Sequence, residues 1–190
     1  MKAWIAGYMK AQRAAHESIP LEAVGKLIAT FAARADGRSA DFCFWERRQR
    51  GQRLSLRHRF GQGASDKLGK RFRILALNDN VSWLTALAND YAYDEIFAGP
   101  LRNYGKPGDI AFGISVSGNS PNCVKAMEWA KGNGLQTIAV VGAKRGRMAE
   151  LADQAIVIND VHYGRVEDAQ MTICHLLCYA FMENPALGRT

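Results

Sequence analysis

Residues 109–121 read DIAFGISVSGNSP, and this stretch decides the fold class. Its first part, residues 110–114, is apolar throughout, which is typical of a strand that is buried on both faces of a parallel sheet. The second part carries three serines, an asparagine and a glycine just before Pro121, a residue that suits the first turn of a helix. The stretch therefore predicts a strand, a polar turn and a helix, in that order.

Further expected strands and helices alternate on either side of this stretch. Strands are expected at residues 73–77, 136–141 and 154–158. The spacing of apolar residues predicts helices at 2–34 (in two parts), 82–88, 121–131, 147–151 and 166–182. Ser18 is expected to cap the second helix, and Pro20 to lie in its first turn. We therefore predict one α/β domain over residues 1–190, a doubly wound parallel sheet with flavodoxin-like layering, preceded by a helical pair within residues 1–35.

The composition limits the cellular setting. With 190 residues and 48% hydrophobic residues, the chain suits one domain with a sizeable core. It shows neither an apolar run of the roughly 20 residues that a membrane span needs nor a signal-peptide pattern, so we expect a cytoplasmic protein with no membrane partner. The four cysteines form no CxxC pair, which fits a reducing compartment. Cys174, His175 and Cys178 have a spacing that could suggest a metal site, but an apolar helix face is the simpler interpretation.

The turn at residues 115–120 has the composition of an anion site. Hydroxyls, an amide and free backbone N–H groups would meet at a helix N-terminus, where the helix dipole favours a phosphate. The candidate binding residues are Ser115, Ser117, Gly118, Asn119 and Ser120. An ordinary capped turn uses the same residue types, so that alternative stays open. The chain has no P-loop pattern here and no GxGxxG fingerprint on its strand–turn–helix units.

Residues 108–120 resemble the segment "GD-apolar-GIS-x-SGNS" of SIS domains, which are sugar isomerase modules. The segments 78–80, 89–91 and 165–175 are similar to the phosphoheptose isomerase branch of that family. The resemblance implies the interconversion of sedoheptulose 7-phosphate and a heptose 7-phosphate through an enediol, in the carbohydrate metabolism that supplies lipopolysaccharide heptose. It also implies a homotetramer with active sites between subunits, and usually a bound zinc ion.

The resemblance also implies roles for individual residues. His175 matches the catalytic histidine of the family, and Glu167 stands eight residues earlier, where glutamine is frequent. Both would be catalytic residues and metal ligands, while the serines would hold the phosphate and Asp90 would contact substrate. Val116 stands where the family often has threonine, which removes one hydroxyl. By composition alone, His175 could be a core histidine, and Asp90 could simply be a loop residue.

Residues 38–62 depart from the family pattern. A second phosphate-binding turn, GNGGS, should follow the first strand near residues 45–49, but the chain reads WERRQ there. When the codons of residues 41–61 are read one base later, one allowed choice encodes IFVFGNGGSGANASHFATDLG, which contains the missing turn. Our hypothesis is that two compensating frame changes flank this segment. In the chain as it stands, we expect the central strand to be lost and the segment to lie outside the core.

The same segment explains the basic charge. The chain has a formal net charge of +7, and six arginines fall between Arg47 and Arg59. The shifted frame would instead give a histidine at position 55 and an aspartate at position 59, the other expected metal and acid/base positions, where the chain has Ser55 and Arg59. Because the shifted frame contains none of these arginines, the arginine cluster is no evidence for a nucleic-acid partner.

Two other function classes remain open at this stage. The first is a non-catalytic SIS relative that binds a sugar phosphate or the replication initiator DnaA, although that regulatory branch lacks the histidine found here at position 175. The second is a sugar-phosphate sensor, although no DNA-binding segment is recognisable beside the domain.

Overall fold

The computed structural model describes residues 1–34, 39–45 and 59–188. A five-stranded sheet forms the middle layer, and every strand pair in it is parallel. The strands are β1 (Ala40–Trp45), β2 (Arg73–Ala76), β3 (Ile110–Ser115), β4 (Gln136–Gly142) and β5 (Gln154–Ile158), in the spatial order β2-β1-β3-β4-β5. This is the flavodoxin-like 2-1-3-4-5 order of doubly wound sheets, so the predicted fold class is confirmed.

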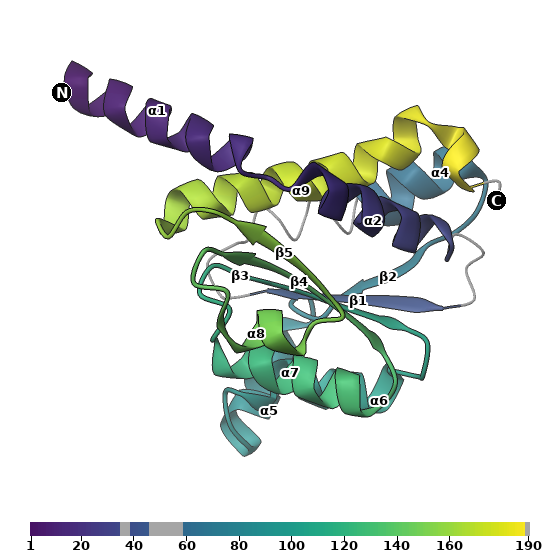
Figure 1. Ribbon diagram of the computed structural model, residues 1–190. Coiled ribbons are helices and arrows are strands. Elements are labelled where there is room, and N and C mark those ends of the chain that lie inside the picture. The colour runs from purple at the N-terminus through teal and green to yellow at the C-terminus, as the bar shows by residue number, and fades with distance from the viewer. Residues whose placement is uncertain (35–38, 46–58, 189–190) are drawn as a thin grey trace.

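Helices cover both faces of the sheet (Figure 1). One face carries α2 (Leu21–Ala32), α4 (Ser65–Leu68) and the long α9 (Tyr163–Glu183), while α1 (Lys2–Glu17) packs against α9 and projects beyond it. The other face carries α5 (Val81–Asp90), α6 (Glu95–Tyr104), α7 (Pro121–Gly132) and α8 (Gly146–Leu151). A π-helical turn, η1 (Arg59–Ala64), and a 3₁₀ turn, η2 (Pro185–Gly188), complete the described elements. Within the described residues, no helix is both long and apolar enough to cross a bilayer.

The sheet separates two apolar clusters, one under each layer of helices. Alternate residues of a strand point to opposite faces, and β1 shows this clearly. Phe42 and Phe44 pack into the cluster beneath α6 and α7, whereas Cys43 and Trp45 pack into the cluster beneath α2 and α9. Both β1 and β3 are buried along their whole length. The apolar runs seen in the sequence are therefore the two-sided core strands of a parallel sheet.

The strand β1 corrects one of our expectations. We expected the chain as written to lose this strand and to keep the segment outside the core, but Ala40–Trp45 is the second strand of the sheet and pairs with both β2 and β3. The physical reason is that the arginines begin only at Arg47, so the aromatic run before them can be buried. Residues 46–58, which include Ser55 and most of the arginine cluster, lie outside the described residues.

Two further details of the fold differ from expectation. Ser18 does not cap α2, because Pro20 is the N-cap residue; Ser18 instead ends α1, and its hydroxyl donates to the Ala15 carbonyl at 2.7 Å. Helix α6 was not predicted at all, since Gly99 and Pro100 lie inside it and both disfavour a helix interior. Its buried face, which includes Phe97 and Leu101, supplies the tertiary packing that outweighs this preference.

Candidate functional site

The serine-rich turn lies at the switch point of the sheet. In a 2-1-3-4-5 sheet, the connections from β1 and β3 leave in opposite directions, and a crevice opens at the carboxyl ends of these two strands. Residues 116–120 connect the carboxyl end of β3 to α7, so the turn lies at this crevice. The connection that follows β1 belongs to the residues that are not described.

Three serine hydroxyls come together in this turn. The buried Ser115 hydroxyl lies 3.4 Å from the hydroxyl oxygens of both Ser117 and Ser120. The backbone N–H of Gly118 donates to the Ser115 hydroxyl oxygen at 3.2 Å, and the N–H of Asn119 donates to that of Ser117. This spacing is the geometry expected of groups that can converge on one small oxyanion. The predicted grouping of Ser115, Ser117 and Ser120 is present in the structure.

The neighbouring helix α8 supports the turn. The side-chain oxygen of Asn119 accepts a hydrogen bond from the Arg147 N–H at 2.8 Å, and the Gly118 carbonyl accepts one from the Met148 N–H at 2.9 Å. Gly118 has a φ of +66°, which glycine adopts without strain. The turn is therefore held by two hydrogen bonds from α8. Val116, where the family often has threonine, is buried in the apolar core.

Helix α7 adds an electrostatic contribution to the turn. Ser120 is its N-cap residue and Pro121 occupies the first helical position, where a missing N–H costs nothing. The partial positive charge at the N-terminus of this 12-residue helix faces the same end of the sheet as the serines. Hydroxyls, backbone N–H groups and a helix dipole together can bind a phosphate.

His175 and Glu167 lie on the other face of the sheet, on α9. This helix begins near the carboxyl end of β5 and returns along the sheet, so His175 is about 18 Å along the helix axis from Tyr163, where the helix starts. Both side chains are half-buried. Burial, and secondarily the charge of Arg59, lower the pKa of His175 below its usual value. No described interaction joins His175 to the serine turn within this one chain.

Arg59 stands at a position where the resemblance calls for an acid, and it contacts the helix that carries His175. Its Nη1 donates to the Tyr179 hydroxyl at 2.6 Å, and its guanidinium carbon lies 5.5 Å from the centre of the Tyr179 ring. The rings of Tyr179 and His175 meet edge to face with centres 6.3 Å apart. The guanidinium is thus a fixed positive charge next to the candidate catalytic histidine.

The described residues do not make up a metal site. Among them there is no group of three or more His, Cys, Asp and Glu side chains that could hold an ion, whereas zinc normally takes three or four protein ligands. Cys174 and Cys178 are buried in the core, and burial raises the pKa of Cys178 to about 12 and that of Cys174 further still. Neither thiol would readily become the thiolate that binds metal. The simpler interpretation of these cysteines as an apolar helix face is therefore confirmed.

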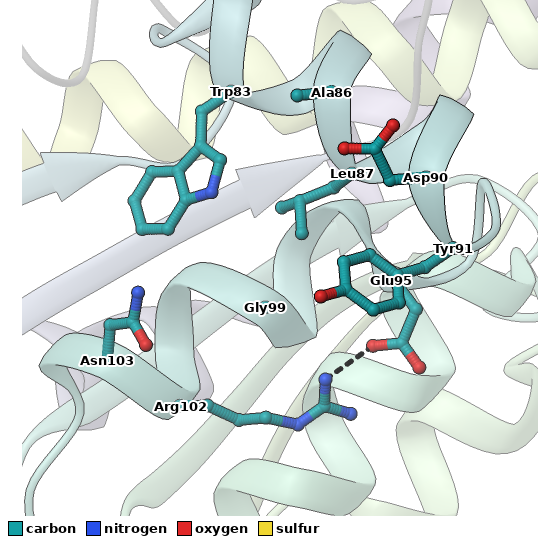
Figure 2. A pocket seen from close by; sticks show the side chains of 9 residues that line it. All are labelled: Trp83, Ala86, Leu87, Asp90, Tyr91, Glu95, Gly99, Arg102 and Asn103. Atoms are coloured by element: carbon teal, nitrogen blue, oxygen red, sulfur yellow. Dashed lines mark hydrogen bonds and ion pairs between the residues drawn. The ribbon is translucent and has the colours of Figure 1, made fainter.

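Asp90 lies in a separate hollow. A cavity of about 390 Å³ lies between α5 and α6. Trp83, Asp90 and Tyr91 line one side of it, and the ion pair of Glu95 and Arg102 lies on the other (Figure 2). Among the described residues that line it, none belongs to the turn at 115–120. The structure therefore does not bring Asp90 together with the serines in this chain.

The asparagines of the 78–80 segment have roles in local structure. The Asn78 side chain bonds both backbone groups of Trp45, accepting from its N–H at 3.2 Å and donating to its carbonyl at 2.9 Å. The Asn80 side chain caps α5 by accepting from the Trp83 N–H at 3.0 Å. Asn78 thus fixes the carboxyl end of β1, which borders the crevice.

Comparison with known proteins shows which proteins the chain is similar to. Residues 59–142 match the family model described as the SIS domain. This match shows that the chain is similar to the SIS domain over residues 59–142. In sequence it is 40% identical over 116 residues to a probable phosphoheptose isomerase of Thermoplasma volcanium, covering 61% of this chain and 59% of the relative. It is 43% identical over 104 residues to a phosphoheptose isomerase of Sulfurimonas denitrificans, covering 55% of this chain and 53% of the relative.

Solved structures extend the similarity of fold to nearly the whole chain. A phosphoheptose isomerase from Francisella tularensis has a TM-score of 0.81 at 18% identity, with 96% of both chains covered. One from Neisseria gonorrhoeae has a TM-score of 0.78 at 23% identity, with 96% of this chain and 98% of that chain covered. In sequence, however, the chain spans only between half and three fifths of the length of the two curated relatives named above.

Proposed function

We propose that this SIS domain binds a phosphorylated sugar at residues 115–120 and interconverts sedoheptulose 7-phosphate and a heptose 7-phosphate. The observation that carries the proposal is the convergence of the Ser115, Ser117 and Ser120 hydroxyls at the N-terminus of α7. The similarity in sequence to phosphoheptose isomerases, at about 40% identity, supports the choice of substrate.

In this proposal the serine turn anchors the phosphate and so positions the sugar carbonyl. An aldose–ketose isomerase removes a proton from the carbon next to the carbonyl and returns a proton to the neighbouring carbon. His175 is our candidate for one of these transfers, because its lowered pKa keeps the imidazole neutral and able to accept a proton at pH 7. Glu167 would orient the His175 imidazole or share its role in proton transfer. Asp90 would contact the substrate only from the cavity between α5 and α6.

Self-association belongs to the same proposal. The described chain leaves His175 and the serine turn on different faces of the sheet, so a site formed between subunits would be needed to join them. Helix α1 leaves Trp4, Ile5 and Met9 at 66%, 48% and 57% exposure, which supports a surface covered by another copy. We propose a homotetramer, which sedimentation equilibrium would test. A reducing cytoplasmic location is supported by four free, buried cysteines.

The resemblance would also add zinc, with His175 and Glu167 as ligands. The described residues supply these two candidate ligands and, beside one of them, the cation Arg59, which does not fit a metal site. We therefore assign no step of the reaction to a metal.

The direct test is a turnover assay with sedoheptulose 7-phosphate, run on the full chain and on His175→Ala. We expect the wild-type chain to form heptose 7-phosphate and the variant to lose at least 100-fold in kcat while it still binds the substrate. No turnover by a folded wild-type chain that binds the substrate would disprove the isomerase and favour the second candidate.

That second candidate is a SIS domain that binds a sugar phosphate without converting it. One specific observation favours it: position 59, where the resemblance calls for an acid, holds an arginine that is bonded to Tyr179. Such a chain would keep the serine turn and lack one of the two groups that transfer protons.

A further inference from the structure

Arg59 is held in place by the packing of its neighbour Phe60 and by a hydrogen bond of its own guanidinium. The next residue, Phe60, is fully buried and packs against the rings of Phe31, Phe72 and Phe181. This packing fixes the start of the π-helical turn against α9. From there, the guanidinium reaches the Tyr179 hydroxyl at 2.6 Å. The position of the positive charge is therefore set by the core and does not depend on a flexible surface side chain.

Tyr179 joins this cation to His175. The two residues are four apart on α9, so they lie on the same face of the helix, and their rings are 6.3 Å apart. Arg59 is close enough for its charge to act on the imidazole. It uses one nitrogen for Tyr179 and has further N–H donors on the same planar group.

A guanidinium at this position opposes a divalent metal for two reasons. It carries a positive charge, so it repels a second cation. It also has no lone pair to donate, so it cannot replace a carboxylate as a ligand. The described residues around His175 then fall short of the three or four ligands that zinc requires.

We propose that Arg59 takes the place of a metal ion beside His175, so that this site has a guanidinium as its fixed cation and binds no divalent metal. A planar guanidinium is suited to an anionic oxygen, such as one that develops on the sugar during isomerisation. This role in the reaction rests on the proposed function, whereas the exclusion of metal does not.

The experiment is a calorimetric titration of the full chain with zinc chloride, after intact mass has confirmed that Arg59 is present. Four proteins are compared: wild type, His175→Ala, Arg59→Glu and the double variant. We expect wild type and His175→Ala to bind the same number of zinc ions. We expect Arg59→Glu to bind one more, and the double variant to lose it.

Two results would overturn the proposal. One is a wild-type chain that binds one zinc ion more than His175→Ala. The other is an Arg59→Glu variant that gains no zinc ion, since Arg59 would then not be what excludes the metal. Arg71→Glu is the matched control, because Arg71 has a 73% exposed side chain that pairs with Asp66. Thermal melts of all variants show whether each is folded.

The rate of substrate turnover gives a second test of the role of Arg59. If the chain is an isomerase, we expect a chelator to leave its rate unchanged within about twofold, and Arg59→Gln to lose at least 10-fold in kcat without recovery on adding zinc. A rate that the chelator abolishes and zinc restores would contradict the proposal. If no protein in the series turns over substrate, the proposed function fails, and the zinc titration alone decides the role of Arg59.

Discussion

Gly118 lies so close to Arg145 that a Cβ atom on Gly118 would be 2.0 Å from the Arg145 carbonyl oxygen. The two residues belong to the connections after β3 and after β4, which leave the sheet side by side. Gly146 is equally confined, because its Cβ would lie 2.5 Å from the Ser117 carbonyl oxygen. The conformation of the serine turn thus depends on a second segment that carries none of its hydroxyls.

We therefore expect Gly118→Ala to weaken the binding of a sugar phosphate. The backbone must move to make room for the methyl group, and the residue also has a φ of +66°, so the cost should be about 1–3 kcal/mol in stability. Isothermal titration with sedoheptulose 7-phosphate should show at least a 10-fold rise in Kd. Gly132→Ala is the control, because nothing lies within 4 Å of the added Cβ, and it should leave the Kd unchanged. Equal binding by the two variants would contradict the role of this turn.

Ser120→Ala tests the hydroxyl cluster without changing the backbone. A hydrogen bond to a charged phosphate contributes about 1.5–3 kcal/mol, so we expect KM for the sugar phosphate to rise about 10- to 100-fold. The free energy of unfolding should change by less than about 1 kcal/mol, since the α7 cap makes no side-chain hydrogen bond. Ser82→Ala, at an exposed position of α5, is the matched control. An unchanged KM in Ser120→Ala would show that the Ser120 hydroxyl does not bind the phosphate.

Asp41 should make stability fall as pH rises. Its carboxyl group is buried in β1 with one oxygen unpartnered, beside Asp109 and Arg34, and burial raises its pKa to about 7. The folded state therefore holds the proton more tightly than the unfolded state. The stability from this group is complete below about pH 4 and is lost as pH rises through about 7, a change of up to about 4 kcal/mol. Chemical denaturation at pH 5 and pH 8 should show this loss, and Asp41→Asn should reduce it. A variant with the wild-type slope would refute the assignment.

Asp160 should behave in the opposite way. The Arg165 guanidinium bonds both of its oxygens, at 2.6 and 2.9 Å, and lowers the pKa of the carboxyl group to about 2. Its contribution is present above about pH 4 and is lost as pH falls through about 2, so Asp160→Asn should cost about 2 kcal/mol at pH 7 and progressively less in acid. Equal costs at pH 7 and pH 2.5 would show that the ion pair is not responsible.

The hypothesis of compensating frame changes makes a prediction at the level of codons. Residues 45–49 should be encoded by TGG-GAA-CGG-CGG-CAG, because only these codons give the GNGGS turn one base later when Arg50 begins with C. Sequencing the gene checks this, and GAG at Glu46 would already contradict it. Intact mass then shows whether the protein is the 21.0 kDa chain with Arg59 in place. Asp41 fits the hypothesis, since its buried position receives isoleucine in the shifted frame.

Much of the architecture could be read from local pattern. The strands β3, β4 and β5 are continuous apolar runs, so their burial in a parallel sheet follows from composition and length. The serine turn was also found in this way, because hydroxyls and glycine before a helix-starting proline are a local signal. Helix α6 was missed because its local preference is poor and only its contacts with the core stabilise it.

By itself, the sequence determined the fold class, the serine turn and the helix that carries His175, because each depends on residues that are close together in the chain. Only the tertiary structure decided that Ala40–Trp45 is a core strand, since burial of its aromatic residues requires both layers of helices. It also decided where the Arg59 guanidinium lies: Arg59 and Tyr179 are 120 residues apart in the chain, and their contact forms because Phe60 packs into the core next to α9.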